Sequence, residues 1–127
     1  MTLLVVAAGG AMGAVSRYLA TGWVQDLTGD SFPWGTFLVN VVGSLVLGFS
    51  MVWLQSAVSS ADLRQFITIG FLASFTTFST FSYEAVVMLR DREGWQAGGY
   101  VVGSVALSLM AVVVGMAMAS ALTQGRT

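Results

Sequence analysis

The chain has 127 residues, of which 56% are hydrophobic and only 9% are charged, and its mean hydropathy is +0.81. Because about a quarter of the residues in a water-soluble domain are charged, this composition excludes a soluble globular protein. All five basic residues are arginine, and histidine and cysteine are absent, which excludes a basic surface for nucleic acid, imidazole chemistry, disulfides and thiolate metal sites.

Four long apolar runs follow one another along the chain, with short polar gaps between them. A hydrocarbon core about 30 Å thick needs about 20 residues of helix, and the sequence meets this requirement at residues 3–23, 34–54, 66–89 and 98–122. No basic residue precedes the first run, so we expect a retained span and not a signal peptide. The sequence therefore predicts an all-α membrane protein, a single domain of four transmembrane helices.

The arginines give little preference for one orientation in the membrane. Arg64 and Arg126 would share the side of the termini, Arg90 and Arg92 the opposite side, and Arg17 lies near the far end of the first span. Because basic residues normally mark the cytoplasmic side, this near balance predicts insertion in both orientations. Four helices of this length enclose little volume, which favours a pathway between subunits. We therefore expect an antiparallel, dual-topology homodimer.

Small residues in the first span lead to a charge. Gly9, Gly13 and Arg17 recur at four-residue steps and share one helix face. The glycines are typical of close helix packing in membranes. Arg17 has two interpretations, since it can extend to the lipid headgroups or form an electropositive vestibule for an anion.

The second span presents a small, polar face. Thr36, Asn40, Ser44 and Gly48 follow one another at four-residue steps. Packing and function explain Thr36, Ser44 and Gly48 equally well, because small and hydroxyl side chains join membrane helices. For Asn40 we favour function, because an amide in hydrocarbon needs partners and its NH2 group is a good donor to an anion.

The third span holds the densest signal. Residues 74–82 crowd six hydroxyls and three phenylalanines into its middle. The phenylalanines from 71 to 81 share a flank of a regular helix and would align more closely on a tighter 3₁₀ turn. Hydroxyls can satisfy backbone groups freed by a break, so we expect the helix to break near the bilayer centre and expose carbonyls for a cation. The rings either pack in the core or present their partly positive edges to an anion.

The fourth span carries an aligned row of hydroxyls. Tyr100, Ser104 and Ser108 recur at four-residue steps on an otherwise apolar helix. The row can act as a ladder of donors. It is equally explained by an interfacial tyrosine and by serines that bond to their own backbone.

Several of these segments together resemble the Fluc fluoride channels, also called CrcB. The matching pieces are GGAMGAVSRY at 9–18, GTFLVNVVGS at 35–44, and GF at 70–71 followed by TTFSTFSYE at 76–84. The last piece is highly specific, whereas the hydroxyl row of the fourth span is a looser match. The resemblance implies an antiparallel homodimer in the cell inner membrane that exports fluoride passively through two pores. It also implies a structural sodium ion at the dimer centre, between two broken third helices.

The resemblance implies a role for each matching residue. Phe78 and Phe81 resemble the pore phenylalanines, Asn40 the pore asparagine, Ser79 and Thr80 the adjacent hydroxyls, Tyr100, Ser104 and Ser108 the polar track of the fourth helix, and Arg17 the vestibule arginine. Backbone carbonyls near Ala73 and Thr76 would hold the sodium ion. The family usually has a glycine pair where this chain has Ala73-Ser74, and a Cβ there can hinder the backbone turn.

The strongest alternative is a small proton-coupled drug exporter, since such exporters are also four-span, dual-topology dimers. Exporters of this kind look built around a membrane-embedded carboxylate on the first helix. The only intramembrane acid expected here is Glu84, near the end of the third span. A non-conducting assembly subunit is a second alternative, in which the hydroxyl rows only join helices. An enzyme is not expected, because the sequence offers no nucleophile with a base and no metal cluster.

Overall fold

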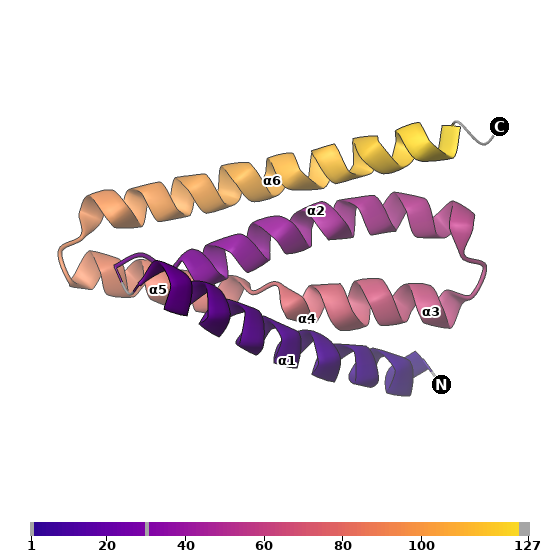
Figure 1. The fold of residues 1–127 in the computed structure, drawn as a ribbon, viewed down its shortest axis with the longest axis horizontal. Helices are drawn as coiled ribbons and strands as arrows, with labels where there is room; N and C mark the ends of the chain where they lie inside the picture. The colour runs from indigo at the N-terminus through magenta and orange to yellow at the C-terminus, as the bar shows by residue number, and fades with distance from the viewer. Residues whose placement is uncertain (1, 30, 125–127) are drawn as a thin grey trace.

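The computed structural model describes residues 2–29 and 31–124. Arg126, which entered the count of arginines, lies outside the described residues. Within them, four helical segments are long and apolar enough to cross a membrane, which confirms the predicted number of spans. The segments alternate in direction, so the first residues of the bundle and the last lie at the same end (Figure 1).

Three of the four crossings are single continuous helices. These are α1 (Thr2–Thr28), α2 (Trp34–Ala57) and α6 (Gly94–Gln124). The third crossing is assembled from α3 (Ala61–Gln65), the π-helix η1 (Phe66–Leu72), α4 (Ala73–Phe75) and α5 (Phe78–Arg90). Each crossing contains its predicted apolar run and extends beyond it, because helices continue from the hydrocarbon into the polar headgroup layer.

The third crossing is irregular in two places. η1 has wide π turns, which the sequence did not indicate. Thr76 and Thr77 have extended backbone, with ψ angles of 159° and 123°, and they separate α4 from α5. Ala73 has a φ of −65° and a ψ of −30°, which are ordinary helical angles for any residue. The Cβ of Ala73 is therefore compatible with the backbone conformation at this position.

Close contacts between helices depend on glycine. α1 packs against η1, and a Cβ added at Gly13 would collide with the carbonyl oxygen of Phe71. α2 packs along α6, and a Cβ at Gly115 would collide with the carbonyl oxygen of Leu45. Small residues allow such approach between membrane helices, which associate through packing and not through a hydrophobic driving force.

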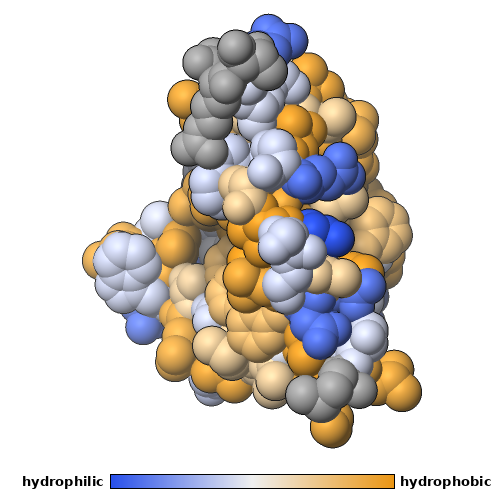
Figure 2. Space-filling model, turned by 90° about the vertical axis from the view of Figure 1, so that its right-hand side faces the viewer, coloured by the Kyte–Doolittle hydropathy of each residue, from blue (hydrophilic) through white to orange (hydrophobic). Residues whose placement is uncertain are grey.

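Polar side chains gather at the end of the bundle that carries the connection between α2 and α3. Figure 2 shows this end, with hydrophilic residues grouped among apolar ones. Ser60 caps α3 by accepting from the Leu63 N–H at 3.2 Å, and Arg64 donates to the Val58 carbonyl at 2.6 Å. Satisfied loop groups and exposed charges are typical of a turn at a membrane surface.

Candidate functional site

A groove of about 210 Å³ lies where α2, α5 and α6 meet beside Thr76 and Thr77. None of the nine residues that line it is charged; they are Asn40, Ser44, Thr76, Thr77, Phe78, Phe81, Ser104, Val105 and Ser108. Most of the side chains that the sequence singled out for an anion path are among them. The fold therefore gathers, in one place, polar and aromatic residues from three separate crossings.

Asn40 clamps the backbone of Thr77 with two hydrogen bonds. Its Nδ2 donates to the Thr77 carbonyl at 2.9 Å, and its Oδ1 accepts from the Thr77 N–H at 2.7 Å. A side-chain amide has two N–H donors, so one donor remains for the groove that Asn40 lines. The sequence pointed to Asn40 but not to Thr77, since the two residues are 37 positions apart.

Thr77 is also the N-cap of α5. Its Oγ1 accepts from the Thr80 N–H at 3.2 Å, an N-cap of a kind that contributes about 1 kcal/mol. Ser79 and Thr80 lie on the first turn of α5, where both are exposed and outside the groove lining. Within one chain, these two hydroxyls are therefore near the groove without facing it.

Phe78 and Phe81 form an aromatic wall of the groove. Their ring centroids are 5.7 Å apart, with ring planes at 50°. Phe81 is only 7% exposed and packs against Tyr100 with a centroid distance of 5.0 Å, whereas Phe78 is 75% exposed. The two rings thus differ in environment, because one belongs to the core and the other projects from the chain.

α6 supplies hydroxyl groups of two kinds. In the described part of the chain, the buried hydroxyl of Ser104 has no hydrogen-bond partner. Ser104 lines the groove together with Ser108, while Tyr100 is fully buried between Phe81 and Phe32. The serine at 104 therefore does not bond to its own helix. A buried hydroxyl without a partner lowers the stability of the fold by about 1–3 kcal/mol. In the groove, the Ser104 hydroxyl is available as a donor to a bound ion.

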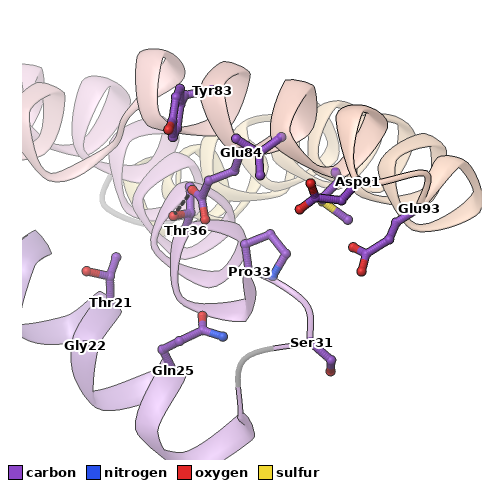
Figure 3. A pocket seen from close by; sticks show the side chains of 12 residues that line it. Thr21, Gly22, Gln25, Ser31, Pro33, Thr36, Tyr83, Glu84, Asp91 and Glu93 are labelled. Carbon is purple, nitrogen blue, oxygen red and sulfur yellow. Dashed lines mark hydrogen bonds between the residues drawn. The ribbon is translucent and has the colours of Figure 1, made fainter.

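A larger cavity of about 580 Å³ lies between the end of α1, the start of α2 and α5 (Figure 3). Glu84 points across it, and its Oε1 accepts from the Thr36 hydroxyl at 2.6 Å. Asp91 and Glu93 also line this cavity. The sequence alone assigns Glu84 no role and leaves Thr36 between packing and function, because no local pattern joins residues 48 positions apart.

Arg17 is half-buried on α1 and lines neither cavity. Thr21, one turn further along α1, lines the larger cavity and donates to the Arg17 carbonyl at 2.8 Å. The arginine therefore lies close to this cavity along the helix, and its vestibule role stays a prediction.

The family of CrcB-like proteins (Camphor Resistance, CrcB) matches residues 4–116. The chain belongs to the CrcB family. It is 47% identical over 116 residues to the "Fluoride-specific ion channel FluC" of Geobacter sulfurreducens, covering 91% of this chain and 94% of that relative. Proteins of the same name match from Hahella chejuensis, at 45% over 117 residues (91% and 92% covered), and Geotalea uraniireducens, at 47% over 122 residues (95% and 98% covered). Together with its four membrane-length helices, this membership makes the chain a multi-pass membrane protein.

In this CrcB chain, the extended residues also interrupt the helical hydrogen bonds, and the carbonyls of Ala73 and Thr76 are among those that lose their helical donor. In a continuous helix the Thr77 N–H would bond to the Ala73 carbonyl, and the Thr80 N–H to the Thr76 carbonyl. Both donors are used elsewhere, by Asn40 Oδ1 and by Thr77 Oγ1. The Ala73 carbonyl receives a long contact of 3.4 Å from the Thr76 hydroxyl. These are the two carbonyls that the sequence resemblance assigned to a cation.

Proposed function

We propose that this chain is a fluoride-selective channel through which fluoride leaves the cell passively along the groove between α2, α5 and α6. The observation that carries the proposal is the buried, unpartnered hydroxyl of Ser104 inside an uncharged groove. A small, strongly hydrated anion must find replacement donors where it loses its water. The curated relatives are named as fluoride-specific ion channels, which supports fluoride as that anion.

The groove offers donors without a fixed positive charge. The free N–H of Asn40 and the hydroxyls of Ser104 and Ser108 donate to the ion, and the edges of Phe78 and Phe81 add weak positive potential. An embedded arginine would hold a small anion too tightly to release it. Uncharged donors instead bind the ion well enough to strip its water and weakly enough to let it pass.

The channel in this proposal is an antiparallel, dual-topology homodimer with two pores. Phe78 is 75% exposed, and Ser79 and Thr80 are exposed beside it. A second chain over this face would close the groove and bring these two hydroxyls to the ion path. The near balance of arginines between the two ends supports insertion in both orientations.

A structural sodium ion belongs to the same proposal, and the residues present fit it. The released carbonyls of Ala73 and Thr76 are hard oxygen ligands, which suit a hard cation. The described residues contain no group of three His, Cys, Asp or Glu side chains that could hold a metal, so backbone carbonyls are the fitting donors. When bound, the ion would supply positive charge that balances these carbonyl dipoles. It would also join the extended segment of one chain to the same segment of the second chain.

The relatives are named as ion channels. Their names therefore give no support to a proton-coupled drug exporter. Its central carboxylate has no counterpart in the middle of α1, where the acid Asp26 lies only in the last turn, and Glu84 on α5 is hydrogen-bonded to Thr36.

The proposal places the channel in the cell inner membrane. Arg17, one turn from the larger cavity, draws anions to the pore entrance as a vestibule arginine.

Flux from proteoliposomes tests this function. Vesicles loaded with fluoride or chloride are diluted into an impermeant salt, a potassium ionophore is added, and each anion is followed with a selective electrode. We expect rapid fluoride release at every pH, with chloride release no faster than from vesicles that contain chloride but no protein. Chloride release as fast as fluoride release would refute selectivity, and fluoride release that requires a proton gradient would refute a passive channel.

A further inference from the structure

We propose that Asn40 positions the backbone of Thr77 so that the Ala73 carbonyl stays available to a cation, which makes one amide a link between the anion groove and the carbonyl site. The inference rests on the proposed function for the identity of the two ions. It goes beyond a donor role for Asn40, because it assigns the same side chain a task on the opposite side of the break.

The hydrogen bonds define this link. Asn40 Oδ1 takes the Thr77 N–H at 2.7 Å, and that N–H is the one that a continuous helix would give to Ala73. Asn40 Nδ2 holds the Thr77 carbonyl at 2.9 Å, so both polar groups of this peptide residue are fixed by one side chain. Thr77 is buried, and a buried N–H without a partner is costly. If the amide were removed, the Ala73 carbonyl would be the acceptor that helical geometry offers.

The face of α2 that carries Asn40 is fitted to the extended residues at a second point. A Cβ added at Gly43 would collide with the Thr76 methyl group. Gly43 thus lets α2 lie directly against the break, three residues from Asn40. This close approach places α2 beside the residue that precedes Thr77, within reach of the Asn40 amide.

The test compares the thermal unfolding of purified full-length protein in sodium and in N-methylglucamine buffers. A ligand that binds only the folded state raises the melting temperature, so we expect a sodium-dependent rise for the wild type. Asn40→Leu should lose most of this rise, because the Thr77 N–H returns to Ala73. Ser50→Ala is the matched control, a buried polar residue on α2 away from the break, and it should keep the full rise. If Asn40 has a purely structural role, Asn40→Leu should lower the melting temperature equally in sodium and in N-methylglucamine buffer. The difference between the two buffers would then equal that of the wild type, and this result would overturn the inference.

Asn40→Asp separates the two tasks and serves if the leucine variant does not fold. An aspartate keeps the acceptor for the Thr77 N–H, the bond that holds this N–H away from Ala73, but it loses the donor to the Thr77 carbonyl and to the groove. It should therefore keep a sodium-dependent rise, smaller than that of the wild type, while fluoride flux is lost. Complete loss of the rise in this variant would contradict the positioning role.

If the wild type shows no sodium-dependent rise, the sodium part of the proposed function fails and the clamp is judged by hydrogen exchange. The Thr77 amide should exchange slowly in the wild type and in Ser50→Ala. In Asn40→Leu, a continuous helix would also give the Phe78 and Ser79 amides acceptors at the Ser74 and Phe75 carbonyls, so these two amides should become more protected. Unchanged exchange of both amides in Asn40→Leu would overturn the inference independently of any bound ion.

Discussion

Replacing Phe81 tests whether the aromatic wall contacts the ion or only fills the core. The ring is 7% exposed and lies 5.0 Å from the Tyr100 ring between centroids. Truncation to alanine removes this packing and leaves a cavity, which costs about 3–5 kcal/mol in protein cores. The Tyr100 pair accounts for about 0.5–1.5 kcal/mol of that cost. We therefore expect Phe81→Ala to unfold at a clearly lower temperature than the wild type.

Phe81→Leu separates the ring from its volume. Leucine keeps a branched apolar side chain that fills part of the space of the ring, so this swap should cost less than truncation to alanine. It has no aromatic edge, so an ion that contacts the ring should pass at least about tenfold more slowly, equivalent to ~1.4 kcal/mol of barrier. The assay pairs thermal unfolding with fluoride efflux for the same preparation.

Phe78→Leu is the companion variant, because Phe78 is 75% exposed in the chain and contributes little to its core. It should leave the unfolding temperature of the chain nearly unchanged and slow fluoride as strongly as Phe81→Leu. If both leucine variants fold and conduct at the wild-type rate, the rings are packing residues and the aromatic part of the account is wrong.

Four further predictions follow from the geometry. Asn40→Asp should abolish fluoride efflux, because it replaces the amide donor of the groove with an acceptor; efflux at the wild-type rate would place Asn40 outside the path. Ser104→Ala should slow efflux while leaving the unfolding temperature unchanged or raised, since it removes a buried hydroxyl without a partner; a lower unfolding temperature with normal efflux would contradict this. Gly13→Ala should destabilise the protein by about 1–3 kcal/mol, because its Cβ meets the Phe71 carbonyl, whereas Gly22→Ala on the same helix has open space and should not. Reporter fusions at the carboxyl terminus should signal on both sides of the membrane, and a one-sided signal would overturn dual insertion.

The four crossings were predictable because their signal is local. A run of about 20 apolar residues is long enough to cross a membrane whatever its tertiary contacts, and the four-residue spacing of Ser104 and Ser108 places both on one face of α6. The third span was expected to break, and Thr76 and Thr77 have extended backbone there. The place of the break at the bilayer centre stays a prediction.

Contacts between crossings could not be predicted from one sequence. The Asn40 clamp on Thr77 and the Thr36 bond to Glu84 join residues that are 37 and 48 positions apart. Spacing gave the face of α6 but not what packs against it, so it could not show that the Tyr100 ring packs against Phe81. The π turns of η1 lack a marker as well, because phenylalanine spacing alone does not distinguish a tight turn from a wide one.

The central claim is that fluoride crosses alone, and the reversal potential of the current measures this most directly. Purified protein in a planar bilayer is given a tenfold fluoride gradient, first at equal pH and then with an opposing pH gradient, with chloride as the balancing anion. The account predicts reversal near the fluoride equilibrium potential, about 59 mV for a tenfold gradient of a single charge, unchanged by the pH gradient. A reversal potential near zero, or one that follows the proton gradient, would contradict it.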